Sequence, residues 1–282
     1  MDGVKIITDS TAYIPQSYVD QYGLEVVPLT VNWEEKSYLD GVDIRADEFY
    51  TRLKDAVTLP TTNAISVHQF EELYKKLTDE GHSVLVLPIS SGISASYNNA
   101  ITALEHFKDK PVAVLDTRLV SMALTFMVLA AARKAETGAS LEEVKAEAVR
   151  AYDHIGVYFT VDDLKYLHKG GRIGGAKRLL GSALKIKPIL EIRNGKIEAA
   201  GSAVTRKKAL ERIVSLVEDG IAGRSPVRIS VFHALDLDTA QYLEEVCRER
   251  FSPVEMIPSE VSPVVGSHVG PGTVSIAYMA GM

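Results

Sequence analysis

The sequence predicts an α/β protein of two domains. The first, residues 1–153, is a parallel-sheet three-layer α/β domain, and the second, residues 154–282, is an α+β domain with a mixed sheet. Three observations lead to this prediction. The chain has 282 residues, which is long enough for roughly two domains. Its first half alternates β-rich runs with helical patterns, and its second half contains a clear hairpin signal.

In the first half, short runs rich in β-branched and aliphatic residues predict strands at 4–8, 24–31, 83–89 and 111–115. Apolar residues at helical spacing predict helices at 46–57 and 67–78. This alternation predicts a parallel sheet, in which ligands bind beyond the carboxyl ends of the strands. The loops that begin near Thr8, Ser90 and Asp116 are therefore expected to lie side by side.

The second domain is expected to begin after a helix at 140–150, with a new strand pattern at 156–159. Strand patterns at 188–192 and 196–200 flank Asn194 and Gly195, and Asn-Gly between two strands is a strong hairpin signal. Helical patterns follow at 206–219 and 238–250, and residues 273–278 predict a final strand. Together these patterns predict a mixed sheet with helices.

Composition argues against several classes of protein. A net charge of −6 does not favour nucleic acid binding, which depends on pooled Lys and Arg. The longest apolar run, 119–132, is shorter than the about 20 residues of a membrane span, so it predicts a buried helix and no stable membrane insertion. The single cysteine, Cys247, cannot form an internal disulfide. The N-terminus lacks a signal-peptide pattern, so the cytoplasm is the expected location.

The serine loop, Pro88 to Tyr97, joins a predicted strand to a helix expected to begin near Ser94 or Ser96. Free N–H groups at a helix N-terminus favour an anion, and serine hydroxyls add donors. The loop lacks the lysine of a phosphate-binding P-loop and the second glycine of a nucleophile elbow. It therefore predicts a site for the anionic head of a small ligand, with a capping turn as the structural alternative.

Three other polar segments are candidates for the same site. Thr62 and Asn63 lie in a predicted turn between helical patterns, where capping is again the alternative. His268 lies in a predicted Gly- and Pro-rich loop without metal ligands at suitable spacing, so no metal site is predicted. Arg172 lies between glycine pairs in the stretch 164–190, which has no Asp or Glu. An arginine so placed can pair with a carboxylate or phosphate of a ligand or partner.

Five segments, in order along nearly the whole chain, resemble the DegV family of bacterial fatty-acid-binding proteins. They are Ile7-Thr8-Asp9-Ser10-Thr11, Ser90 to Tyr97, Lys169-Gly170-Gly171-Arg172-Ile173, Lys187-Pro188-Ile189-Leu190 and His268-Val269-Gly270-Pro271-Gly272. The resemblance implies two domains, a long-chain fatty acid in a buried tunnel, and no catalysis or cofactor. It further implies that the carboxylate is presented to an ATP-dependent fatty acid kinase subunit, which makes acyl phosphate for phospholipid synthesis.

The resemblance also implies the site. The residues that would hold the carboxylate are Thr62, Ser94, Ala95 through its backbone amide, and His268. Further ligand or partner contacts would be Asn63, Ser91, Arg172 at the mouth, and Arg206 as a docking position. This chain departs from the family's pattern at Ala95, where glycine is common, at residues 63–65, and at Val204, where many relatives carry arginine.

Two other functions stay open from the residues: a lipase or esterase that uses Ser94 with His268, and a lipid-responsive regulatory protein. The energetics agree with a carrier, because about 14 buried methylenes at about 0.8 kcal/mol each contribute roughly 11 kcal/mol before ordering costs. Within the apolar run, Met122, Phe126 and Met127 either line the acyl tunnel or belong to the plain core.

Overall fold

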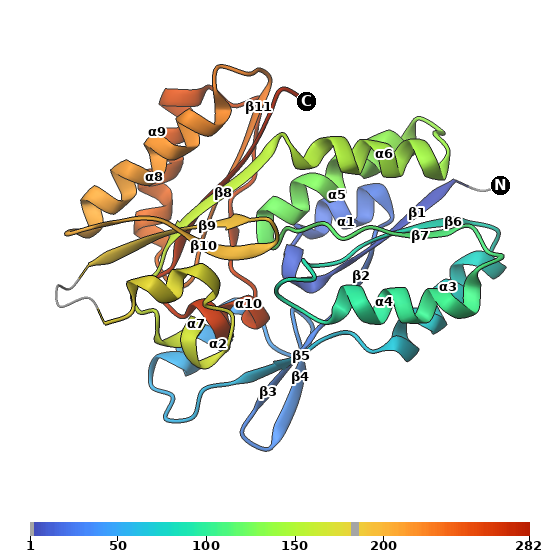
Figure 1. Ribbon diagram of the computed structural model, residues 1–282, viewed down its shortest axis with the longest axis horizontal. Coiled ribbons are helices and arrows are strands. Elements are labelled where there is room, and N and C mark those ends of the chain that lie inside the picture. The colour runs from blue at the N-terminus through green and yellow to red at the C-terminus, as the bar shows by residue number, and fades with distance from the viewer. Residues whose placement is uncertain (1–2, 182–185) are drawn as a thin grey trace.

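Two β-sheets face a central helix in the computed structural model, which describes residues 3–181 and 186–282 (Figure 1). One sheet is parallel and the other is mixed, so the predicted fold class is confirmed. Part of the stretch 164–190, residues 182–185, lies outside the described residues.

The first sheet is parallel throughout, with the strand order β2-β1-β6-β7. Its strands are β1 (Val4–Asp9), β2 (Glu25–Val27), β6 (Ser83–Leu87) and β7 (Val112–Val114). Helices α3 (Val67–Asp79) and α4 (Ser96–Leu104) pack on one face, and α5 (Ser121–Glu136) and α6 (Leu141–Tyr152) on the other, which makes three layers (Figure 1). The shorter helices of this half are η1 (Ser10–Ala12), α1 (Gln16–Tyr22) and η2 (Glu105–Phe107).

The loops after β1, β6 and β7 lie side by side, as expected for parallel strands. The Asp9 carboxylate accepts a 2.6 Å hydrogen bond from the backbone N–H of Ile89. The backbone N–H of Ser91 donates to Asp116 at 3.1 Å, and its hydroxyl donates to the same carboxylate at 2.5 Å. The serine loop is therefore held from both neighbouring loops.

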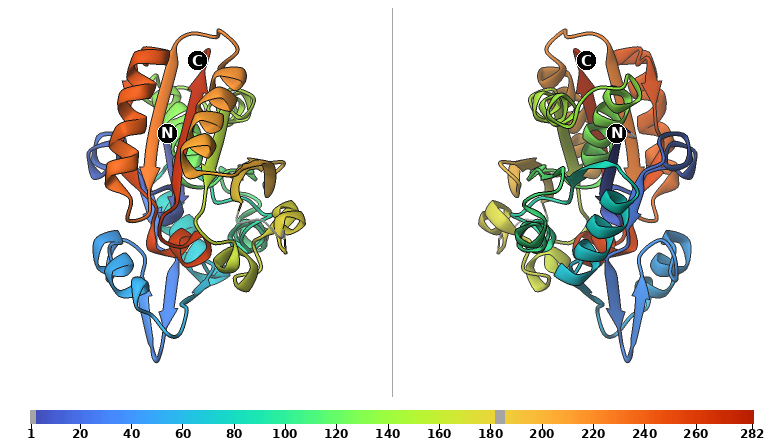
Figure 2. Two further views of the ribbon diagram at one scale, coloured as in Figure 1. Left: turned by 90° about the vertical axis from the view of Figure 1, so that its left-hand side faces the viewer. Right: turned by 90° about the vertical axis from the view of Figure 1, so that its right-hand side faces the viewer.

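The predicted strand 24–31 is wrong in one respect, because it is two strands in different sheets. Pro28 separates β2 from β3 (Thr30–Trp33), since proline has no N–H for a sheet ladder. β3 is the centre of a small antiparallel sheet with β4 (Lys36–Leu39) and β5 (Thr61–Asn63), which lies at the bottom of both views in Figure 2. The predicted turn at Thr62 is also wrong: Thr62 lies on β5, opposite Val31.

The second sheet has the order β10-β9-β8-β14-β11-β12, and β13 also pairs with β11. Its strands are β8 (Ile155–Thr160), β9 (Lys187–Arg193), β10 (Lys196–Ala203), β11 (Val227–His233), β12 (Glu255–Met256), β13 (Ser259–Glu260) and β14 (Val274–Ala280). Asn194 and Gly195 form the predicted hairpin turn with φ of 51° and 76°. Helices α8 (Arg206–Ile221) and α9 (Leu237–Phe251) cover the face away from the first sheet (Figure 1).

Helix α5 lies between the sheets and packs against β1 of the first and against β8 and β14 of the second. All residues from 121 to 132 are buried, so the predicted buried helix is confirmed. Met122, Phe126 and Met127 belong to the main hydrophobic core. In the described part of the chain, no helix has the length and apolar character needed to cross a membrane.

Helix α10 (Pro263–Val269) corrects the prediction of a loop around His268. It packs on α2 (Ala46–Lys54), on the small sheet and on α7 (Lys165–Lys169), which precedes η3 (Gly174–Leu179). Gly266 does not break this helix; a Cβ there would lie 2.4 Å from the Tyr50 hydroxyl, so glycine allows close packing. Because α10 packs on the first half and the main core draws on both halves, the domain division at residue 153 stays a prediction.

Candidate functional site

A pocket lies between the two halves of the protein, with about 790 Å³ of empty space including its opening to solvent. Its walls are mainly apolar, with Leu29 and Ile89 from the first half and Val157, Phe159 and Phe232 from the second sheet. None of Met122, Phe126 and Met127 is among the described lining residues, so these three side chains are plain core. A pocket of this size and lining suits a hydrocarbon chain.

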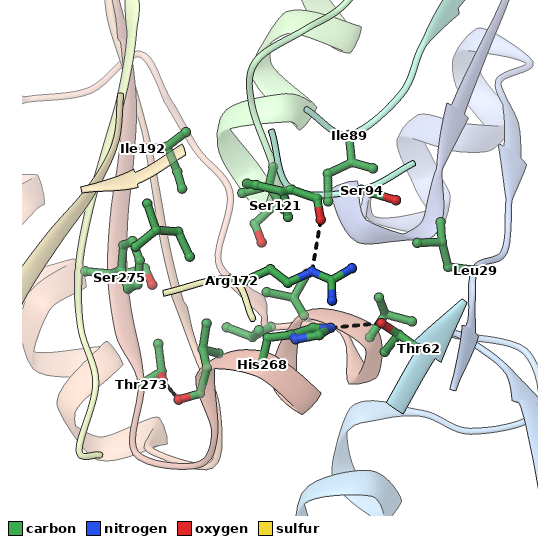
Figure 3. Close-up of a pocket in the computed structure, with 18 of the residues that line it drawn as sticks. Leu29, Thr62, Ile89, Ser94, Ser121, Arg172, Ile192, His268, Thr273 and Ser275 are labelled. Atoms are coloured by element: carbon green, nitrogen blue, oxygen red, sulfur yellow. Dashed lines mark hydrogen bonds between the residues drawn. The ribbon is translucent and has the colours of Figure 1, made fainter. Parts of the chain in front are cut away.

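Polar side chains gather at one end of this pocket (Figure 3). Thr62 on β5 and His268 on α10 are joined by a hydrogen bond, with 2.8 Å between Oγ1 and Nε2. Asn63, Ser94 and Arg172 also line the pocket. Four segments that are distant in the sequence thus supply one polar cluster.

His268 is a neutral side chain in this environment. Burial, reinforced by the positive charge of Arg172, lowers its pKa from 6.5 to about 4. Its Nδ1 is buried and has no hydrogen-bond partner among the described residues. Gly170 permits this position, since a Cβ there would lie only 2.2 Å from Nδ1. Glycine at position 170 is therefore needed for the imidazole of His268 to occupy this position.

Arg172 is the only Lys or Arg among the described residues that line the pocket. Its Nε donates to the carbonyl of Ile93 at 3.0 Å, and its Nη1 donates to the carbonyl of Gly170 at 2.8 Å. Nη2 has no protein partner in the described part of the chain. Two carbonyls thus orient the guanidinium, and its remaining donors are free for an anion.

The serine loop enters the site through Ser94. The following helix, α4, begins at Ser96, and Ser94 Oγ accepts from the Ser96 N–H at 3.2 Å while lining the pocket. Ala95, the N-cap residue, is exposed and is not among the described lining residues. The glycine of the loop, Gly92, is needed for a protein contact: a Cβ there would lie 2.5 Å from the carbonyl oxygen of Gly195.

Two further predicted positions lie outside the described pocket lining. Ser91 is exposed and hydrogen-bonded to Asp116, as described above. Arg206 forms ion pairs with Asp162, at 3.1 Å, and with Asp236, and it donates to the carbonyl of Gly272 at 2.8 Å. The structure therefore brings together five of the eight predicted site residues: Thr62, Asn63, Ser94, Arg172 and His268.

Asp40 is a buried carboxyl group that the sequence-based reasoning missed. It follows β4 and accepts hydrogen bonds from Ser10 Oγ at 2.7 Å and from the Val264 N–H at 3.3 Å. Val264 lies in the first turn of α10, so Asp40 anchors the helix that carries His268. Burial raises the pKa of Asp40 to about 7.

This raised pKa predicts a pH dependence of stability. Between pH 4 and 7 the folded protein holds a proton on Asp40 that the unfolded chain, with a pKa of 3.8, has released. Its contribution to stability is therefore present at low pH and is lost as pH rises to about 7. We expect Asp40→Asn to lack this pH dependence. As pH rises from 4 to about 7, its free energy of unfolding, measured by denaturant titration, should increase relative to that of wild type, and the difference should be constant above pH 7. Asp55→Asn, at an exposed position, should run parallel to wild type; a parallel Asp40→Asn curve would contradict the prediction.

The geometry does not favour a serine hydrolase. Such a site needs a histidine whose Nε2 faces the serine and whose Nδ1 binds a carboxylate. Here Nε2 contacts Thr62, and Nδ1 has no partner among the residues described. Ser94 Oγ instead contacts Ser96 Oγ at 3.0 Å. A histidine with a pKa of about 4 is also a weak base for activating a hydroxyl.

A family model, curated proteins and solved structures that are similar to this chain all belong to one family. The family model described as "Uncharacterised protein, DegV family" matches residues 3–281. A DegV domain-containing protein of Streptomyces coelicolor is 36% identical over 275 residues, 97% of each chain. A structure described as "Fatty Acid Binding of a DegV family Protein" from Thermus thermophilus superimposes with a TM-score of 0.93 at 35% identity, covering 99% of both chains. DegV of Bacillus subtilis, described as a fatty acid binding protein, gives 0.90 at 32% identity over 99% of both chains. The chain belongs to the DegV family.

Proposed function

We propose that this protein binds a long-chain fatty acid in the pocket between its two halves. The observation that carries the proposal is the convergence of Thr62, Ser94, Arg172 and His268 at one end of a mainly apolar pocket. The fatty acid binding of the Thermus and Bacillus relatives supports it. The acyl chain would lie along the apolar walls, with the carboxylate at the polar end.

Each part of the ligand would have its own energetic role. The apolar chain supplies most of the affinity, because burial of methylenes in a largely preformed pocket is favourable. The carboxylate would accept hydrogen bonds from Arg172 Nη2 and from the hydroxyls of Thr62 and Ser94. A bound carboxylate would also favour a proton on His268, whose pKa would rise from its value of about 4.

The finer proposal is that the bound carboxylate is presented to an ATP-dependent kinase subunit for acyl-phosphate formation. It rests on the family resemblance and on the serine loop, which has no P-loop lysine to bind a nucleotide itself. In this proposal the protein is a carrier that positions the acceptor and does not catalyse. The need for ATP makes the cytoplasm the proposed location.

A lipid extraction tests the binding proposal most directly. The purified protein is denatured and extracted with organic solvent, and the extract is examined by mass spectrometry. We expect about one fatty acid per chain, or stoichiometric uptake of added fatty acid; absence of both would refute the proposal. The kinase proposal is tested separately, by measuring whether acyl phosphate forms only when the loaded carrier, ATP and a kinase subunit are all present.

Removing two neutral donors from the polar end should weaken binding. Thr62→Val combined with Ser94→Ala is expected to lower fatty acid affinity at least about 10-fold, since a hydrogen bond to a charged acceptor contributes roughly 1.5–3 kcal/mol. The measurement is the dissociation constant by calorimetry. Thr61→Val combined with Ser17→Ala is the control of the same chemical change, because both positions are exposed and outside the described lining. Equal affinity of the two double variants would remove Thr62 and Ser94 from the site.

A further inference from the structure

Two serine hydroxyls line the pocket in addition to those of the polar end. Ser275 lies on β14 and Ser121 at the start of α5, and Figure 3 shows Ser275 on the opposite side of the pocket from Thr62. Only 3% of Ser275 and 6% of Ser121 is exposed. Neither hydroxyl has a hydrogen-bond partner within 3–181 or 186–282. Because both residues line the pocket, an occupant of the pocket can supply the missing partner.

Three other hydroxyls of the same sheet region and of α5 form hydrogen bonds within the protein. Thr273, the residue before β14, donates to the carbonyl of Gly270 at 2.9 Å. Ser230 on β11 donates to the carbonyl of Ile257 at 2.6 Å. Thr125 on α5 donates to the carbonyl of Ala12 at 2.7 Å. Ser275 and Ser121 differ from these three residues, because buried hydroxyls are normally paired. Thr160 Oγ1 on β8 is also buried without a partner among the described residues, but Thr160 is not among the described lining residues of the pocket.

The hydroxyl of Ser275 is a polar group in apolar surroundings. On β14 it lies on the inward face, two and four residues before Ala277 and Met279, which belong to the main core. In the sheet register it lies between Phe159 of β8 and Phe232 of β11, and both phenyl rings line the pocket. An alanine would leave the same space without a polar atom. The hydroxyl thus adds a polar point to an aromatic wall.

Ser121 adds donors from a second direction. It is the first residue of a 16-residue helix and has a φ of 54°, a left-handed conformation that costs energy for any residue but glycine. The N-cap residue, Val120, provides no side-chain hydrogen bond and also lines the pocket. The first N–H groups of a helix lack partners within it, so this end of α5 favours an acceptor.

We infer that the pocket accepts an acyl chain that carries an oxygen substituent, a hydroxy or oxo group, away from its carboxylate. The hydroxyl of Ser275 or Ser121 hydrogen-bonds to that oxygen. The inference rests on the proposed function and names its class of ligand. An unsubstituted chain leaves both hydroxyls buried without a partner, which costs free energy that an oxygen at the right carbon recovers.

The test is a series of hydroxystearates with the hydroxyl at successive carbons, with the matching oxo acids and stearate. Wild type should bind one position, or two adjacent ones, about 3- to 10-fold more tightly than the rest of the series, the size expected of a single hydrogen bond. Equal affinity across the series would overturn the inference while leaving fatty acid binding intact. If no member binds, stearate included, the proposed function itself fails.

Variants then assign the contact. Ser275→Ala or Ser121→Ala should abolish the preference for the favoured position, measured as the ratio of its affinity to that of the other members of the series. Circular dichroism shows that each variant is folded. Ser230→Ala is the matched control, since that serine lies on the same sheet and bonds to the protein. If both alanine variants keep the wild-type preference, the serines do not contact the substituent and the inference is wrong.

Discussion

Arg172→Gln should bind a long-chain fatty acid about 10- to 100-fold more weakly than wild type. Arg172 is the only Lys or Arg among the described lining residues, and Nη2 is free of protein partners there. A charge-assisted hydrogen bond contributes roughly 1.5–3 kcal/mol, and each 1.4 kcal/mol is about tenfold in affinity. Titration calorimetry of the protein freed of bound lipid measures the effect.

The controls for Arg172 separate charge from position. Arg178→Gln removes an arginine of the same segment that bonds to the carbonyl of Ala199 and is absent from the described lining; its affinity should match wild type. Because Arg172 helps to depress the pKa of His268, Arg172→Gln should also raise that pKa in an NMR titration. Wild-type affinity combined with loss of acyl-phosphate formation would place Arg172 against the partner instead of the ligand.

A second large effect on fatty acid affinity is expected when one methyl group is added at Gly170. Gly170→Ala would place a Cβ 2.2 Å from His268 Nδ1, so the imidazole must move and its hydrogen bond to Thr62 is lost. Thr62 is then no longer oriented to donate to the carboxylate, and the loss of that hydrogen bond should lower fatty acid affinity about 10-fold. Binding is measured by calorimetry, and the position of the ring by the His268 NMR signals.

Gly171→Ala is the natural control for this variant. Gly171 has a φ of 70° and nothing within 4 Å of an added Cβ, so alanine strains only the backbone. That strain costs roughly 1–2 kcal/mol of stability and should leave affinity nearly unchanged. If both variants lose affinity equally, backbone strain explains the loss and the seating of His268 by Gly170 is not required.

The sequence was sufficient to predict the elements that depend on residues close together in the chain. Asn194 and Gly195 form the expected hairpin because both adopt the positive φ that its turn requires. The apolar run 119–132 became the buried helix α5, since an all-apolar surface needs protein on every side. Local sequence patterns did not predict the contacts between segments that are distant in the chain. The strand at Thr62 exists because β3 lies beside it, and α10 tolerates Gly266 because Tyr50 packs against it.

The same division holds for the serine loop and the site around it. The sequence alone determined the residue types of the polar end, Ser94, Arg172 and His268 among them, and the family to which the chain belongs. Only the tertiary structure decided which candidates share the pocket: Arg206 pairs with Asp162 and Asp236 outside the described lining, whereas Ser275 faces into it. The physical reason is that a side chain's partners depend on strand register and helix packing, which join residues far apart in the chain.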